Sequence, residues 1–139
     1  TSCQTIRTVL VAIQALLDSD PYMHEPGVAA DNPDRIPYNK CIAFHNLRDG
    51  LGTFVNTCLP RLLPELRHVQ EGPVPMSLRE TVEWLQKHWK TLPTGRTVVP
   101  FYGFETRIDY GMLLAELEAA LARMDRGRKL TETRITLSA

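Results

Sequence analysis

An imidazole and a carboxylate stand side by side at His24 and Glu25, in a stretch that Pro21 and Pro26 enclose. Side chains of these two types bind and transfer protons near neutral pH. Loops carry binding and catalytic residues more often than the elements they connect. This pair is therefore the first candidate site, and the alternative interpretation is a solvated pair of loop residues.

Cys41 and His45 are four residues apart, a spacing at which two side chains on one helix face could share a metal ion. A structural zinc site takes four protein ligands, and no other Cys/His pair in the sequence has a helpful spacing. We therefore predict a packed thiol and a partly buried histidine, with no metal and no cofactor. Cys58 has no activating neighbour in the sequence and is predicted to lie in the core.

Two tryptophans, Trp84 and Trp89, flank His88, an arrangement that would suit a peptide groove. Large aromatic residues more often pack within or beside a core. Packing is therefore the favoured interpretation, and a peptide groove is the alternative.

Composition bounds the class of protein. The 139 residues carry 16 basic and 16 acidic side chains, so the formal net charge is zero and offers no field to attract nucleic acid or an acidic membrane. The apolar content of 43% argues against disorder, and the longest apolar run, Val9 to Ile13, is too short to span a bilayer. The three cysteines form no CxxC pair and no complete disulfide set, which fits a reducing cytoplasmic or nuclear location.

Apolar residues at helical spacing predict the elements that position the candidates. The first helix covers 6–17, and Thr1 with Gln4 has the spacing of a capping box at its start. The stretch 18–37 contains four prolines and no periodicity, which predicts a long loop of the kind that is usually functional or disordered. Within this loop the ring of Tyr22 is predicted to be buried and its hydroxyl to reach water.

Four further helices follow in the prediction. The second starts near Tyr38 and runs to residue 58, a short third covers 62–69, and the fourth starts at a capping box of Ser77 and Glu80 and ends near Lys90. Residues 91–106 are predicted to lie across the core as an extended strap. Asp109 caps the fifth helix, Gly127 ends it, and 128–139 form a tail. The predicted core faces comprise Leu78, Val82, Leu85 and Trp89, and then Tyr110, Leu113, Leu114, Leu117, Leu121 and Met124.

Three separated stretches resemble ubiquitin-conjugating enzymes. Residues 9–17 (VLVAIQALL) followed by 20–27 (DPYMHEPG) are similar to the segment after the active site of that family. Residues 38–42 (YNKCI) and the stretch 100–114, with PFYGF, DY and LL, resemble the Z type among its larger members. Together they cover roughly residues 1 to 125, in the order in which the family has them.

The resemblance implies a mainly α fold over 1–127, equivalent to the C-terminal helical portion of a ubiquitin-conjugating α+β domain with extra C-terminal helices. It implies transfer of ubiquitin or a ubiquitin-like protein from a cysteine thioester to lysine. Glu25, with His24 before it, falls where the family has an acidic residue beside the catalytic cysteine. There a carboxylate would hold the incoming lysine, whose reference pKa is about 10.4, and help it lose a proton. The modifier-facing side of the first helix corresponds to Arg7, Thr8 and Gln14.

In the family a four-stranded sheet and the catalytic cysteine precede the helix that corresponds to 5–17. Cys3 lies too close to that helix to match the nucleophile. We therefore expect the chain to be inactive alone and to meet the activating enzyme and the ligase through upstream regions. The alternative is a non-catalytic pseudo-enzyme or a helical protein-interaction module.

Overall fold

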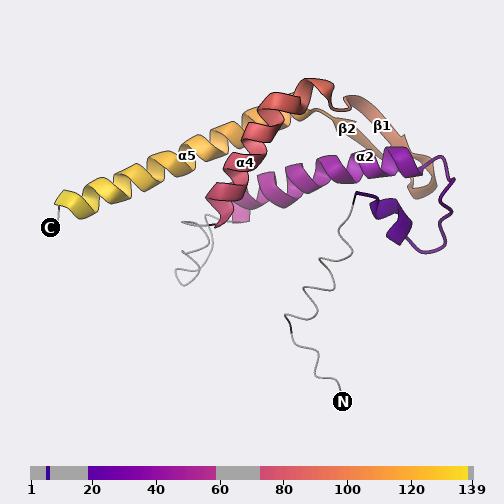
Figure 1. The fold of residues 1–139 in the computed structure, drawn as a ribbon, viewed down its shortest axis with the longest axis horizontal. Coiled ribbons are helices and arrows are strands. Elements are labelled where there is room, and N and C mark those ends of the chain that lie inside the picture. Colours follow the sequence, from indigo (N-terminus) through magenta and orange to yellow (C-terminus); the bar gives the residue numbers. More distant parts are fainter. Residues whose placement is uncertain (1–5, 7–18, 59–72, 138–139) are drawn as a thin grey trace, which may run out of the picture. The chain divides into compact units, whose positions relative to one another are not determined.

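The computed structural model describes residues 6, 19–58 and 73–137 (Figure 1). The described residues form three α-helices and one two-stranded antiparallel sheet, which confirms the mainly α class. None of the helices in these ranges is long and apolar enough to span a membrane. Apart from Ile6, the helices predicted over 6–17 and 62–69 and the capping box of Thr1 and Gln4 lie outside the described residues.

The chain divides into two compact units, one formed by Thr1–Ala43 with Arg96–Thr106 and the other by Phe44–Gly95 with Arg107–Ala139. The first unit has a small core that is rich in tyrosine and includes Tyr22, Tyr38, Cys41 and Val99. The core of the second unit is larger and mostly aliphatic. Its buried residues are Phe44, Val55, Leu78, Val82, Leu85, Ile108, Tyr110, Leu113, Leu114, Leu117 and Ala120.

The predicted loop contains one short 3-10 helix, Pro21–His24, and ends where α2 (Arg35–His45) begins. The helix starts three residues earlier than predicted. Pro37 lies in its first turn, where a missing N–H breaks no intrahelical hydrogen bond. The carbonyl of Asp34 accepts the first bond of the helix from the N–H of Tyr38, at 2.9 Å.

The helix continues after α2 as a π-helix over Asn46–Cys58, not as the α-helix that the sequence predicts. Gly50 and Gly52 weaken an α-helix at this point. The apolar residues Leu47, Leu51 and Val55 recur every four residues, and the wider turn of a π-helix keeps them on one face. Cys58, predicted to lie in the core, is exposed at the end of this helix.

The segment predicted as an extended strap is a hairpin of β1 (Gly95–Val99) and β2 (Phe104–Ile108) (Figure 1). A 3-10 turn over Pro100–Tyr102 connects the strands, and Gly103 ends it with a φ of 64°. Only glycine adopts this left-handed conformation without strain, so Gly103 allows the chain to reverse. The sequence prediction missed this reversal.

The helix α4 (Pro73–His88) begins four residues before the predicted capping box, so Ser77 lies inside the helix and the predicted cap is wrong. Prolines at 73 and 75 fit the first turn, because the N–H groups of a first turn make no intrahelical hydrogen bond. The predicted face is confirmed at Leu78, Val82 and Leu85, which are buried, whereas Trp89 is 37% exposed.

The helix α5 (Tyr110–Leu137) begins after Asp109, as predicted (Figure 1). The Asp109 carboxylate accepts a hydrogen bond from the N–H of Met112 at 2.9 Å, which is an N-cap. The helix does not end at Gly127 but passes through it to Leu137. A single glycine costs a helix only about 1 kcal/mol relative to alanine, and good helix formers flank this one.

Candidate functional site

The predicted pair His24 and Glu25 lies at the end of the 3-10 helix in the first unit. The Glu25 N–H donates to the Tyr22 carbonyl at 3.1 Å and ends that helix. His24 is exposed and Glu25 is half-buried. The other predicted site residues, Arg7, Thr8 and Gln14, lie outside the described residues.

An ion pair fixes the start of the loop that carries this pair. The Arg35 guanidinium binds both carboxylate oxygens of Asp20, with Nε donating to Oδ1 at 3.2 Å. Asn39 donates to the same carboxylate at 2.6 Å and accepts the Tyr22 N–H at 3.0 Å. The hydrogen bond from Arg35, followed by the one from Asn39, lowers the pKa of Asp20. The loop is therefore attached to two successive turns of α2.

The Glu25 carboxylate accepts a hydrogen bond from the Tyr38 hydroxyl, with 2.5 Å between the oxygen atoms. Burial, and then this hydrogen bond, raise the pKa of Tyr38 to about 12. The bond uses Oε1 of Glu25. Within the described ranges, Oε2 makes no hydrogen bond to a side chain or backbone group, so one carboxylate oxygen remains for a cation or a proton.

The tyrosines around this contact pack edge-on or tilted against one another. The Tyr38 ring centroid lies 5.4 Å from that of Tyr22 and 5.2 Å from that of Tyr102. Tyr22 is buried as predicted, but its hydroxyl does not reach water and has no hydrogen-bond partner among the described residues. The rings contact one another and support the Tyr38 hydroxyl that bonds to Glu25.

Asp34, which the sequence analysis did not single out, ties the hairpin turn to α2. Its side chain is buried, and Oδ2 accepts the Phe101 N–H at 2.7 Å. The Asp34 N–H donates to the side chain of Asn32 at 2.8 Å. An aspartate directly before a helix is an available sequence signal, but it indicates a cap and does not reveal a partner 67 residues away.

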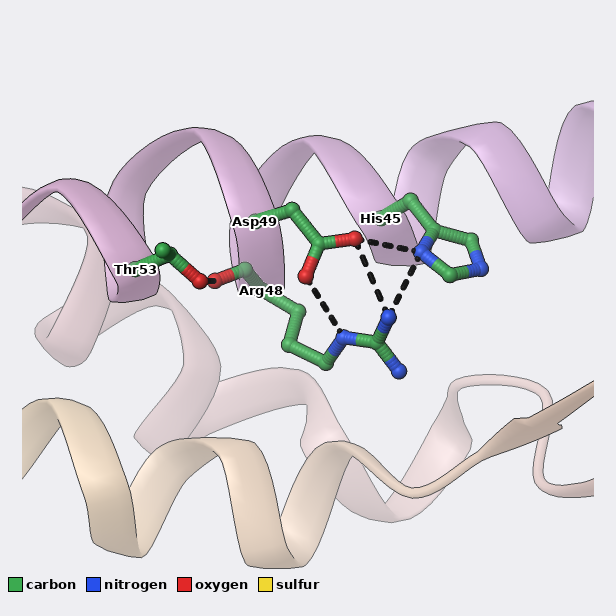
Figure 2. A network of polar contacts seen from close by, with 4 residues as sticks. All are labelled: His45, Arg48, Asp49 and Thr53. Carbon is green, nitrogen blue, oxygen red and sulfur yellow. Dashed lines mark hydrogen bonds and ion pairs between the residues drawn. The ribbon is translucent and has the colours of Figure 1, made fainter.

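A second polar cluster lies in the second unit, where α2 passes into the π-helix (Figure 2). The His45 Nδ1 lies 2.6 Å from Asp49 Oδ2 and 3.0 Å from the Arg48 guanidinium, and Arg48 Nε donates to Asp49 at 2.8 Å. These bonds, that from Arg48 first, lower the pKa of Asp49 to about 2. Thr53 donates to the Arg48 carbonyl at 3.5 Å.

Cys41 is buried, as predicted, and His45 is partly exposed. Burial raises the pKa of the Cys41 thiol, against the opposite effect of a hydrogen bond with Thr106. The thiol is therefore mostly protonated at neutral pH and a poor nucleophile. In the described part of the chain, no three His, Cys, Asp or Glu side chains are arranged to hold a metal ion.

The aromatic cluster of α4 lies at the surface of the second unit. Trp84 is 46% exposed and stacks on His88, with 4.9 Å between ring centroids. The His88 Nδ1 lies 2.7 Å from the Trp84 carbonyl oxygen. Trp89 is less exposed, and Lys90 lies over its ring. The favoured interpretation, in which the tryptophans pack within or beside a core, therefore fits Trp89 better than the more exposed Trp84.

The sequence matches no protein-family model and no curated protein.

Proposed function

We propose that this chain is part of an enzyme that conjugates ubiquitin or a ubiquitin-like protein to lysine, and that Glu25 acts at the acceptor side of the transfer. One observation carries the proposal. Glu25 is a half-buried carboxylate on a loop that is fixed at Asp20, and its Oε2 makes no hydrogen bond within the described ranges. This placement agrees with the acidic position that the sequence resemblance implies.

The proposed chemistry needs a carboxylate of this kind. A lysine amine with a reference pKa of about 10.4 is almost entirely protonated at neutral pH and is then no nucleophile. The amine nitrogen must lose a proton and attack the thioester carbonyl. A C–N bond forms, the C–S bond breaks, the nitrogen releases its second proton to solvent as the amide forms, and the cysteine leaves as a thiolate. Oε2 of Glu25 would hold the amine in place and accept the first proton that it loses.

The other residues have supporting roles in this proposal. His24, exposed next to Glu25, would face the acceptor, and Arg7, Thr8 and Gln14 would face the modifier. The activating enzyme and the ligase would bind to regions that contain the catalytic cysteine. Cytoplasm and nucleus are the compartments in which we expect this activity.

A single-turnover assay tests the role of Glu25 in the enzyme that contains this segment. Glu25→Gln keeps a hydrogen-bond acceptor for Tyr38 but removes the charge. We expect normal thioester formation and slower discharge to free lysine, by at most about 100-fold at neutral pH. The difference in discharge rate between Glu25→Gln and the parent should shrink as pH rises, because the amine then deprotonates without help. Equal discharge by the Glu25→Gln variant and the parent across neutral pH would assign Glu25 to the loop structure alone.

A binding experiment with the isolated chain tests whether the side of the first helix with Arg7, Thr8 and Gln14 contacts ubiquitin or a ubiquitin-like protein. Titration of the isotope-labelled chain with ubiquitin, followed by amide NMR, should shift the signals of residues 7–14. Arg7→Ala should weaken these shifts, and Arg79→Ala, a matched change on α4, should not. Unchanged spectra with ubiquitin and with ubiquitin-like proteins would count against the proposed partner.

The alternative is a non-catalytic interaction module, and the exposure of Trp84 favours it. An accessible tryptophan is a common anchor at protein interfaces. In that case Glu25→Gln would change no transfer rate, whereas Trp84→Ala would abolish binding of a partner. Measuring both variants in the same enzyme separates the two functions.

A further inference from the structure

We infer that Tyr38 is a positioning residue for the proposed transfer, because its hydroxyl holds Oε1 of Glu25 and presents Oε2 to the acceptor amine. The inference rests on the proposed function. It adds a residue that does not touch the lysine and acts only through Glu25.

Tyr38 has little freedom to move. It is 8% exposed, and its backbone lies in the first turn of α2, where its N–H bonds to Asp34. Its ring packs against Tyr22 and Tyr102 and, at 6.2 Å between centroids, against Phe104. A ring held on three sides places its hydroxyl at one position. That position is 2.5 Å from Oε1 of Glu25.

Glu25 has no comparable support of its own. A glutamate side chain has three rotatable bonds and loses much rotational entropy when it is fixed. Its carboxylate has one hydrogen bond within the described part of the chain, the one from Tyr38. Without that bond the carboxylate would sample several rotamers, and Oε2 would face the amine for only part of the time.

The hydroxyl also keeps its proton over the pH range that matters. Burial and the contact with Glu25 raise the pKa of Tyr38 to about 12. The phenol therefore remains a hydrogen-bond donor while the lysine amine, with a pKa of about 10.4, titrates. The contact is expected to persist throughout the pH range of a discharge assay.

Tyr22 provides a matched control. It is buried in the same cluster, but its hydroxyl has no partner in the described residues. Tyr38→Phe and Tyr22→Phe each remove one buried oxygen and keep the ring. Only Tyr38→Phe removes the bond to Glu25.

The test compares single-turnover discharge in the enzyme that contains this segment, using Tyr38→Phe, Tyr22→Phe, Glu25→Ala and the double variant Tyr38→Phe/Glu25→Ala. Each charged enzyme is discharged to free lysine and to hydroxylamine, an amine that is uncharged at neutral pH. We expect Tyr38→Phe to slow discharge to lysine by about 2- to 10-fold. It should leave thioester formation and discharge to hydroxylamine unchanged, and it should have no further effect when Glu25 is already alanine. Tyr22→Phe should behave as the parent.

The other outcomes are decisive. If Glu25→Ala slows lysine discharge and Tyr38→Phe does not, this inference is wrong and the proposed function stands. Equal slowing with lysine and hydroxylamine would mean that Tyr38 only supports the fold, and an undiminished effect in the double variant would mean that it does not act through Glu25. If Glu25→Ala discharges to lysine like the parent, the proposed role of Glu25 is itself wrong.

Discussion

The two units bury different kinds of side chain. The core of the first unit contains Tyr22 and Tyr38, so each ring brings an oxygen atom that must be accommodated. The core of the second unit is mostly aliphatic and includes Leu78, Leu85, Leu113 and Leu117, on α4 and α5, which pack against each other. The first unit therefore depends on hydrogen bonds that reach across its loop, and the second on burial of apolar surface.

This difference shows where a site can be built. Aliphatic side chains stabilise helices, but they have no polar atom that could orient a carboxylate. The tyrosine-rich core orients one, because the Tyr38 ring ends in a hydroxyl beside Glu25. It also contains an oxygen without a partner among the described residues, on Tyr22. A buried hydroxyl without a partner destabilises the first unit, whereas the Tyr38 hydroxyl positions a polar group. Substitutions in each unit can test this difference between the two cores.

Removal of a central leucine should have the largest effect. Leu85 is fully buried on α4, and Leu85→Ala should lower the free energy of unfolding of the second unit by about 2–5 kcal/mol. Both tryptophans of the chain lie in that unit, so urea unfolding followed by tryptophan fluorescence measures it directly. Met112→Ala, at a side chain that is 62% exposed, is the control and should change the midpoint little. Similar losses of unfolding free energy in Leu85→Ala and Met112→Ala would show that the aliphatic core is not the main source of stability of the second unit.

Loss of the α5 cap should be smaller. Asp109→Ala removes the acceptor for the Met112 N–H and should lower the stability of the second unit by about 1 kcal/mol. Asp109→Asn keeps an acceptor and should recover most of this loss. The same fluorescence measurement applies. If asparagine fails to recover stability, the charge of Asp109 contributes and the cap alone does not explain the result.

A gain is expected in the first unit from Tyr22→Phe. The substitution removes a buried hydroxyl with no partner in the described residues and keeps the packed ring. The melting temperature of the first unit should therefore rise by about 2–4 °C. Thermal unfolding followed by the amide NMR signals of residues 35–43 reports on this unit. A fall in melting temperature would reveal a partner for the hydroxyl, such as a bound water.

The smallest effect concerns acid and the polar cluster of the second unit. The folded pKa of Asp49, about 2, lies below its ordinary value of 3.8. The ionised form is therefore the one that folding favours. Its contribution is complete above pH 3.8 and is lost as the pH falls toward 2. Because Asp49 is half exposed, the effect on stability should be slight.

The carboxyl carbon NMR signal of Asp49 measures this pKa directly. Arg48→Ala removes the main cause of the shift and should raise the pKa of Asp49 toward its ordinary value. Arg79→Ala is the control, because Arg79 pairs with Asp125. Equal pKa values of Asp49 in the parent and in Arg48→Ala would show that this cluster contributes no electrostatic stabilisation.

Predictions from the sequence succeeded where short-range patterns decide the structure. The cap at Asp109 and the buried face of α5 depend on residues three or four positions apart, and both are confirmed. The helices α2 and α4 start before the predicted positions, because the prolines near each start fit the first turn of a helix and do not break it. The π-helix was missed because a spacing of four residues fits two kinds of helix.

The sequence by itself determined the mainly α class, the long loop before α2 and the position of Glu25 within that loop. Helix periodicity and turn residues act over a few positions, so they are visible without a structure. The tertiary structure alone decided that Tyr38 binds Glu25 and that Asp34 binds the turn at Phe101, 67 residues away. Such contacts depend on how segments that are distant in the sequence pack against one another, and no local pattern encodes that packing.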